Sequence, residues 1–128
     1  MSDHAIVLFG EEMRTAKTGA TRDTGNTKPE YEGYISPLVV QRYGEYMLKH
    51  QTQANGEQRT SDNWQKGMPR QWFVDSAYRH FLDLLLYHDG YDDFAEEDLQ
   101  EALCALLFNI SGYLHEVILR RDVGADNG

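Results

Sequence analysis

The chain of 128 residues and 14.8 kDa has the size of one compact domain and is too small for two independent cores. Its 41% hydrophobic and 26% charged residues are typical of a globular chain and exclude the disordered and collagen-like classes. No apolar run approaches the roughly 18 residues of a membrane span, and the first residues lack the basic region and the cleavage site of a secretion signal, so we expect neither. The single cysteine, Cys104, gives no sign of an oxidising compartment, so we expect a cytoplasmic protein without a membrane partner.

The net charge of −9 is concentrated in the second half of the chain. Residues 1–69 hold 8 Lys and Arg against 9 Asp and Glu, whereas residues 70–128 hold 4 against 12. Such a chain repels the phosphate backbone of nucleic acid, because binding there needs a basic stripe that releases counterions. The acidity therefore argues against a nucleic-acid duplex as partner. It is compatible with a solvated acidic surface or with a divalent-cation site.

Glycines and prolines divide the chain into an N-terminal arm at 1–18, a single domain at 19–121 and a polar tail at 122–128. The arm holds one short apolar run at 5–9, which suits either a strand or a docking segment. Residues 19–35 are rich in Gly, Thr, Asn and Asp, which is the composition of a loop.

Three helices are predicted after this loop. Ser36 and Pro37 are typical of a helix start, so the first helix should run from about 37 to 50. Apolar residues at helical spacing predict a second helix from about 69 to 88 and a third from about 95 to 120. We therefore expect an all-α fold, a compact bundle of about three main helices with long ordered loops. We also expect a homo-oligomer, because three helices leave apolar stripes that a symmetry mate can cover.

The second predicted helix carries two different stripes. Apolar side chains on one side should form its buried face: Val74, Ala77, Tyr78, Phe81 and Leu85. A polar line recurs beside them at intervals of four, three and four residues: Ser76, His80, Asp83 and Tyr87. A histidine at this place suits a phosphate contact, a general base or a metal ligand, and equally a hydrogen-bonded residue at the edge of the core.

The third predicted helix also carries two stripes. Its main apolar stripe should face the core: Leu99, Leu103, Leu106, Leu107, Ile110, Leu114 and Val117. A second line is made mostly of small residues: Asp98, Ala102, Ala105, Asn109 and Gly112. Small side chains permit close approach of another backbone or of a ligand, and a buried Asn without partners would cost about 1–3 kcal/mol.

The strongest candidate for chemistry is a group of carboxylates. Seven acids and no base lie between residues 89 and 101. With Asp83, the acids at the start of the third helix form a candidate site for Mg²⁺, which prefers oxygen ligands; they are Glu97, Asp98 and Glu101. Capping of a helix N-terminus and exposure to water explain the same acids. Zinc is disfavoured, because Cys104 stands alone in an apolar segment.

Candidate nucleotide contacts lie elsewhere in the chain. The sequence contains neither the Walker-type motif G-x-x-x-x-G-K-S/T nor the Rossmann-type motif G-x-G-x-x-G, so a nucleotide would have to be bound in another way. Arg22 and Lys28, set in the Gly- and Thr-rich segment, are candidate phosphate contacts, although a solvated loop fits the same pattern. Trp64 offers a surface for a base, although simple packing explains it equally well.

Several separated blocks resemble a family of small phage and bacterial proteins, the dATP/dGTP diphosphohydrolase N-terminal domain. The resemblance spans roughly residues 19–119 and rests on GATRDTGNTKPEYEG, DNWQKG, SAYRHFLD and the last apolar helix. The residues that match are Arg22, Asp23, Asn63, Trp64, Gly67, Ser76, Arg79, His80 and Asn109.

This resemblance implies a helical, Mg²⁺- or Mn²⁺-dependent hydrolase of purine deoxynucleoside triphosphates that releases a monophosphate and pyrophosphate. The chemistry is similar to that of the all-helical nucleotide pyrophosphohydrolases, which hold metals on two Glu-x-x-Glu/Asp pairs. This chain departs from that pattern with Glu97-x-x-x-Glu101 and a separate Asp83. The implied roles are metal ligation by Asp83, Glu97, Asp98 and Glu101, catalysis by His80 and Asp83, and nucleotide contact by Arg22, Lys28, Trp64, Arg79 and Asn109.

Two other functions fit the sequence. The same groups would serve a non-catalytic protein that sequesters a nucleotide or cyclic nucleotide, acting in the host cytoplasm if a phage encodes it. A structural helical adaptor would need none of them. Binding of nucleotides, with and without metal, separates the three functions.

Overall fold

Helices dominate the part of the chain that the computed structural model describes, residues 12–24 and 27–124. The contacts divide the chain into two units, Met1–Ser36 and Pro37–Gly128. The predicted all-α class is confirmed, although a short two-stranded ribbon accompanies the helices. The apolar run at 5–9 lies outside the described residues. None of the described helices is both long and apolar enough to cross a lipid bilayer.

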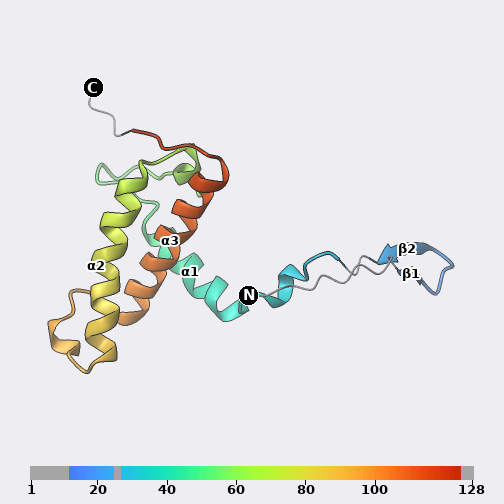
Figure 1. Cartoon of the computed structure of the whole chain (residues 1–128), viewed down its shortest axis with the longest axis horizontal. Helices are drawn as coiled ribbons and strands as arrows, with labels where there is room; N and C mark the ends of the chain where they lie inside the picture. The colour runs from blue at the N-terminus through green and yellow to red at the C-terminus, as the bar shows by residue number, and fades with distance from the viewer. Residues whose placement is uncertain (1–11, 25–26, 125–128) are drawn as a thin grey trace. The chain divides into compact units, whose positions relative to one another are not determined.

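The first unit contains an antiparallel ribbon of β1 (Glu12–Thr15) and β2 (Thr21–Thr24), labelled in Figure 1. Gly19 has a φ of +94°, so the connection uses the left-handed conformation that glycine adopts without strain. The prediction of a loop over 19–35 is wrong at β2, because threonine favours extended backbone and the facing strand supplies hydrogen-bond partners. A short 3-10 helix, η1 (Tyr31–Gly33), follows.

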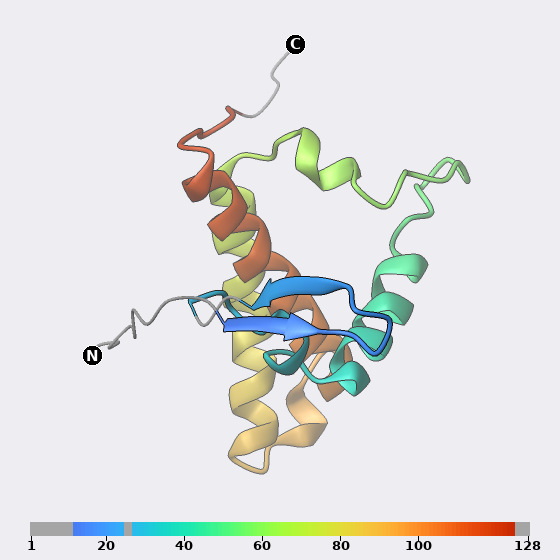
Figure 2. The same cartoon turned by 90° about the vertical axis from the view of Figure 1, so that its right-hand side faces the viewer.

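The second unit contains three α-helices, α1 (Pro37–Lys49), α2 (Arg70–His88) and α3 (Leu99–Ile118). α2 and α3 run antiparallel side by side, and α1 contacts α3 (Figures 1 and 2). Two 3-10 helices lie in the connections, η2 (Asn63–Lys66) before α2 and η3 (Asp92–Phe94) before α3. The three predicted helices are thus confirmed.

The last helix begins later than the sequence predicted, at Leu99 instead of near residue 95. Asp98 is its N-cap, and the Asp98 carboxylate accepts hydrogen bonds from the backbone N–H groups of Gln100 (3.0 Å) and Glu101 (3.4 Å). These N–H groups have no partner inside the helix, so such a cap stabilises it by about 1 kcal/mol. The cap therefore fixes where the turn ends and α3 begins.

α2 and α3 approach each other closely where Phe73 meets Gly112. The Phe73 side chain is 2% exposed, and a Cβ atom at position 112 would overlap its ring. Ala102 and Ala105, on the same line of α3, are buried as well. The small residues of this line therefore serve the close approach that the sequence predicted for them.

The apolar face predicted to be buried on α2 is exposed in this chain, so that prediction is wrong. Four of its five residues are at least 41% exposed: Val74, Tyr78, Phe81 and Leu85. The polar line of α2 lies on the opposite, less exposed side, with Asp83 buried and Ser76, His80 and Tyr87 half-buried. α2 therefore turns its polar line toward its neighbours and its apolar face outward.

The main apolar stripe predicted for α3 is also only partly covered, which corrects a second prediction. Leu103, Ile110, Leu114 and Val117 are exposed, whereas Leu99, Leu106 and Leu107 are half-buried. Three helices give each of α2 and α3 few neighbours, and the small residues of α3 allow the closest contact. Packing therefore uses the small-residue face and leaves apolar area uncovered.

α1 is held against α3 by apolar and charged contacts. Tyr46 of α1 packs with Cys104 and Ala105 of α3, and burial raises the pKa of the Cys104 thiol. Arg42 donates to Glu101 at 2.8 Å, and Lys49 pairs with the same carboxylate. Both cations lower the pKa of the Glu101 carboxyl, and Lys49 has the larger effect. The predicted metal ligand Glu101 therefore ties α1 to α3.

The end of α3 is tied to η2 by a buried acid. Glu116 is 0% exposed and pairs with Arg121, which lowers the pKa of that carboxyl. Arg121 Nη2 also donates to the backbone carbonyl of Gln65 at 2.8 Å. Trp64 directly precedes Gln65 in the chain, and its ring meets the His115 ring edge-on, with the ring centroids 4.9 Å apart. This network places Trp64 against α3.

Candidate functional site

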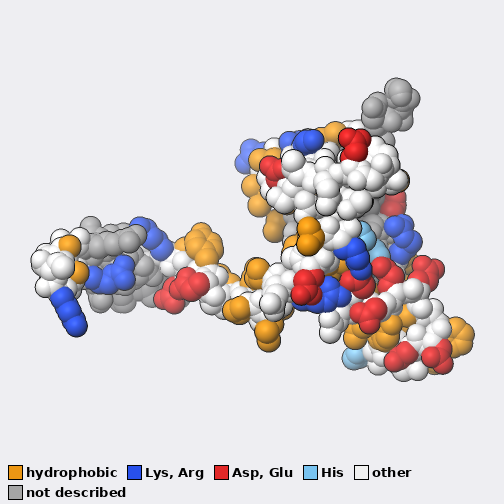
Figure 3. Space-filling model, turned by 180° about the vertical axis from the view of Figure 1, so that it is seen from behind, with side chains coloured by type: hydrophobic (Ala, Val, Ile, Leu, Met, Phe, Trp, Pro, Cys, Tyr) orange, Lys and Arg blue, Asp and Glu red, His pale blue; other side chains and the backbone are white. Residues whose placement is uncertain are grey.

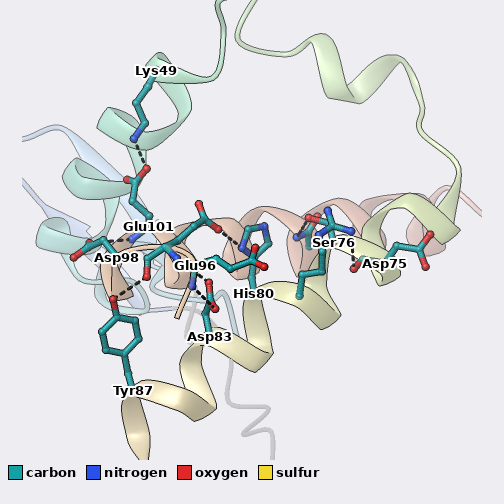
Figure 4. Close-up of polar contacts among 12 residues, drawn as sticks. Lys49, Asp75, Ser76, His80, Asp83, Tyr87, Glu96, Asp98 and Glu101 are labelled. Atoms are coloured by element: carbon teal, nitrogen blue, oxygen red, sulfur yellow. Dashed lines mark hydrogen bonds and ion pairs between the residues drawn. The ribbon is translucent and has the colours of Figure 1, made fainter. Parts of the chain in front are cut away.

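Three groups that can ligate a metal come together between α2 and the turn before α3. One ligand atom each of His80, Asp83 and Glu97 lies within 4.8 Å of the others. Figure 4 shows His80 and Asp83 projecting from α2 toward the segment that leads into α3. The predicted line on α2 thus meets one of the predicted acids at the entry to α3.

The Asp83 carboxylate shapes this turn through its backbone contacts. One oxygen accepts from the N–H of Glu96 and the other from the N–H of Glu97, each at 3.1 Å. Tyr87, one turn further along α2, donates its hydroxyl to the carbonyl of Glu97 at 2.8 Å. Because a carboxylate oxygen has two lone pairs, each Asp83 oxygen keeps one after these bonds. Asp83 therefore both holds the turn and keeps acceptor capacity.

His80 faces Glu97 directly. Its Nδ1 lies 2.6 Å from a Glu97 side-chain oxygen, an ion-pair distance. Nδ1 is nevertheless buried and lacks a hydrogen bond of good alignment. The buried Nδ1 of His80 and the side-chain carboxylate of Glu97 therefore face each other.

The two remaining predicted ligands have other partners. Asp98 caps α3 through the N–H groups of Gln100 and Glu101. Glu101 points to Arg42 and Lys49. Acidic side chains still gather at this end of the second unit, as Figure 3 shows around the turn between α2 and α3. The structure therefore brings Asp83 and Glu97 together with His80 and gives Asp98 and Glu101 structural contacts.

A cavity of about 450 Å³ lies in the second unit between α1, the segment before α2, α2 and α3. Its lining is aromatic and polar and comes from all of these elements: Tyr46, Met47, His50, Gln51, Arg59, Thr60, Ser61, Asn63, Trp64, Met68, Trp72, Ser76, Phe108 and Asn109. Two predicted nucleotide contacts, Trp64 and Asn109, are among these residues. The size lies in the range of small-molecule sites.

The cavity and the His80 group share the polar line of α2. Ser76 lines the cavity and lies one helical turn before His80. Tyr46 also lines the cavity, and burial raises its pKa to about 12, with the negative charges of Glu97 and Glu101 adding to the shift. The cavity wall at Ser76 therefore lies one helical turn from His80 along α2.

Of the predicted cations, Arg79 belongs to the second unit, and Arg22 and Lys28 belong to the first. Arg79 is exposed on α2, and its guanidinium donates to the backbone carbonyl of Asp75 at 3.3 Å. Arg22 lies in β2, where its backbone is paired with Arg14, and Lys28 is exposed in the first unit. Their role toward phosphates stays a prediction.

Several cavity residues were missed by the sequence reasoning. Trp72 lies four residues before Ser76, so extending the polar line of α2 by one turn would have found it. Arg59 and Tyr46 had no such signal, because the loop and α1 reach the cavity only through tertiary packing.

Comparisons of this chain with family models, with curated proteins and with solved structures gave no match. The resemblance to the diphosphohydrolase family therefore rests on its sequence motifs. The geometry of the second unit is the independent observation that bears on function.

Proposed function

We propose that this chain is a metal-dependent hydrolase of purine deoxynucleoside triphosphates, forming a monophosphate and pyrophosphate in the cytoplasm. One observation carries the proposal: the grouped ligand atoms of His80, Asp83 and Glu97 begin one helical turn along α2 from Ser76, which lines an aromatic cavity. A cavity for a base next to a metal-ligating group is the arrangement that a nucleotide with a metal-bound triphosphate requires.

The donor set fits a divalent ion. His80 supplies a buried ring nitrogen without an aligned hydrogen bond, and Asp83 and Glu97 supply carboxylate oxygens. Carboxylates suit Mg²⁺ and Mn²⁺, whereas imidazole is more typical of transition metals, so the mixed set favours Mn²⁺ over Mg²⁺. When bound, the ion would supply Lewis-acid activation of water and charge neutralisation on the phosphates.

The chain's own residues have distinct tasks in this proposal. Asp83 orients the turn through the N–H groups of Glu96 and Glu97, so that the Glu97 side chain reaches His80. With its Nδ1 as a metal ligand, His80 keeps the Nε2–H as a hydrogen-bond donor, which would orient the triphosphate. Arg22 and Lys28 remain the proposed phosphate contacts, on the strength of the sequence motif alone.

The test measures pyrophosphate released from dATP and dGTP with Mn²⁺, using wild type and two matched variants. Glu97→Gln removes the carboxylate that faces His80 and should lower the rate by about 100-fold or more. Glu96→Gln alters the neighbouring exposed acid, whose backbone alone contacts Asp83, and should stay within about twofold of wild type. Absence of pyrophosphate from every deoxynucleotide would overturn the proposal.

A second function is favoured by a specific observation, namely that Asp83, Asp98 and Glu101 all have structural partners. A protein that sequesters a nucleotide or cyclic nucleotide needs the cavity and no turnover. Calorimetry with a nucleotide panel distinguishes the two: binding that survives EDTA and yields no product supports sequestration, and metal-dependent binding supports the hydrolase.

We also propose that the chain self-associates through its exposed apolar faces. The outer faces of α2 and α3 together expose a set of large apolar side chains: Val74, Tyr78, Phe81, Leu82, Leu85, Leu103, Ile110, Leu114 and Val117. A second copy presents the same apolar surface, and isologous contacts between identical patches are the commonest way in which soluble proteins cover them.

A further inference from the structure

Both tryptophans of the chain line one cavity. The sequence has two Trp residues, and Trp64 and Trp72 both belong to the cavity wall. Trp64 is fixed by edge contacts to Phe108 (6.3 Å between centroids) and His115 (4.9 Å). Trp72 is 53% exposed on α2. The cavity thus has one aromatic wall held in place and one at its mouth.

A buried amide lies in the same wall. Asn109 is 3% exposed, and its Nδ2 donates to Ser76 Oγ at 3.0 Å. The Asn109 side chain has two N–H donors and a carbonyl oxygen, so this bond leaves one donor and the oxygen. A buried amide with unused hydrogen-bonding capacity, at the wall of an aromatic cavity, is suited to a planar ring that has a donor and an acceptor on one edge.

We propose that this cavity binds the nucleobase, with Asn109 pairing to its polar edge, Trp64 and Trp72 contacting its faces or rim, and Ser76 acting as a positioning residue for Asn109. The inference rests on the proposed function only in taking the ligand to be a nucleotide. Side-chain amides pair with two adjacent groups of a base, and bases stack on aromatic rings. Ser76 limits the rotation of the Asn109 amide and so fixes which edge it presents.

The spacing along α2 separates this base site from the metal group. Ser76 and Asp83 are seven residues apart, which is about 10 Å along the helix axis at 1.5 Å per residue. A base held by Asn109 therefore lies at one end of the polar line, and the sugar and phosphates extend toward His80 and Glu97 at the other. Base binding and metal binding can then be measured separately.

The experiment uses the full chain and compounds that carry only one part of a nucleotide. Deoxyadenosine and deoxyguanosine, without phosphate and in EDTA, are titrated while the fluorescence of the two tryptophans is followed. At least one nucleoside should give saturable quenching, and 2-deoxyribose 5-phosphate, which has no base, should give none. Quenching by the sugar phosphate alone, or by none of the three compounds, would overturn the proposal.

Three variants test the assigned residues. Asn109→Leu, close in size, should weaken nucleoside binding at least about tenfold, the loss expected when a buried hydrogen-bonding pair is removed. Ser76→Ala should weaken it less, and Ser76→Thr, which keeps the hydroxyl, should restore it. Unchanged affinity in Asn109→Leu would contradict the assignment.

A second site keeps the test informative if Asn109→Leu does not fold. Trp72→Leu changes a half-exposed residue, and the loss of stacking should weaken nucleoside binding about tenfold while Trp64 still reports it. The control is Tyr91→Leu, an exposed aromatic in the turn after α2 that does not line the cavity, and it should bind as wild type does. Equal affinity of Trp72→Leu and wild type would count against the base site.

Failure of the two proposals can be told apart. Nucleoside binding without pyrophosphate release supports the base site and rejects the hydrolase. Pyrophosphate release with normal kinetics in Trp72→Leu and Asn109→Leu, and no nucleoside binding, supports the hydrolase and rejects the base site.

Discussion

The two sides of α2 differ in a way that is unusual for a helix of a small protein. Its outer side exposes Tyr78, Phe81 and Leu85, whereas its inner side carries Ser76, His80 and Asp83. An ordinary amphipathic helix does the reverse. Two of these inner polar groups have specific hydrogen-bond partners, namely Asn109 for Ser76 and the N–H groups before α3 for Asp83, whereas the buried Nδ1 of His80 has none among the described residues. This difference is the basis of the two proposals, a site on the inner side of α2 and self-association through its outer side.

Removing the main apolar group of the inner side should have the largest effect. Phe73→Ala deletes a ring that is 2% exposed and should lower the free energy of unfolding by about 3–5 kcal/mol. Phe94→Ala, at an exposed ring in the turn, should cost less than about 1 kcal/mol. Urea denaturation measures both, and equal losses would mean that Phe73 is no more important than a surface ring.

Adding a methyl group at the close contact between α2 and α3 should destabilise the protein less than removing the Phe73 ring. Gly112→Ala places a methyl group against Phe73 and should destabilise the protein by about 1–3 kcal/mol. Gly44→Ala on α1 has open space around it and should be neutral or stabilising by up to about 1 kcal/mol, since alanine favours helix. A double variant with Phe73→Leu should recover part of the loss in Gly112→Ala. Additive effects would argue against direct contact between these two positions.

Charging the outer side should weaken association instead of folding. Phe81→Glu should raise the dissociation constant of the oligomer at least about tenfold, because it puts a charge into an apolar contact, and leave the helix content unchanged. Asp75→Glu, on the same helix, is the control. Sedimentation over a range of protein concentrations measures the association, and a wild type that stays monomeric at high concentration would contradict the proposal.

The smallest effect concerns the ion pairs of Glu101. Because its folded pKa is lowered by Lys49 and Arg42, the stabilisation is complete above the ordinary carboxyl value of 4.5 and is lost as the pH falls through the lower folded value. Glu101→Gln should therefore lose less stability than wild type as the pH falls below about 4.5. Thermal melts over this range measure it, with the exposed Glu45→Gln as control. Parallel curves for Glu101→Gln and wild type would show that the pairs contribute nothing.

The elements of the second unit could be predicted from sequence because their signals are local. Pro37 begins the first helix, and the polar turn after His88 separates the other two. The predicted start of α3 was too early, because the Asp98 side chain caps the helix and residues 95–97 before it are not helical. The strand at Thr21–Thr24 was not predicted, because its extended conformation depends on hydrogen bonds to the partner strand, and the local sequence does not show that pairing.

The candidate site was predictable only in part. His80, Asp83 and Asn109 were found because periodicity along a helix is visible in the sequence. The roles of the three acids could not be predicted in the same way, although the acids are close in sequence. Glu97 faces His80, Asp98 caps α3 and Glu101 pairs with α1. Glu97 lies in the turn, Asp98 is the extended N-cap and Glu101 lies in the first turn of α3, so the three side chains leave the backbone in different directions. Only the positions of α1 and α2 decide what each of them meets.

The charge asymmetry and the helical periodicity are properties of the sequence alone, and so are the small-residue line and the polar line. Which line faced inward was decided by tertiary structure. Apolar stripes predict burial only when enough neighbours exist to cover them, and with three helices the closest contact fell where Gly112 admits Phe73. That choice placed the polar line of α2 inside, brought His80 and Asp83 together with Glu97, and left the apolar faces outside.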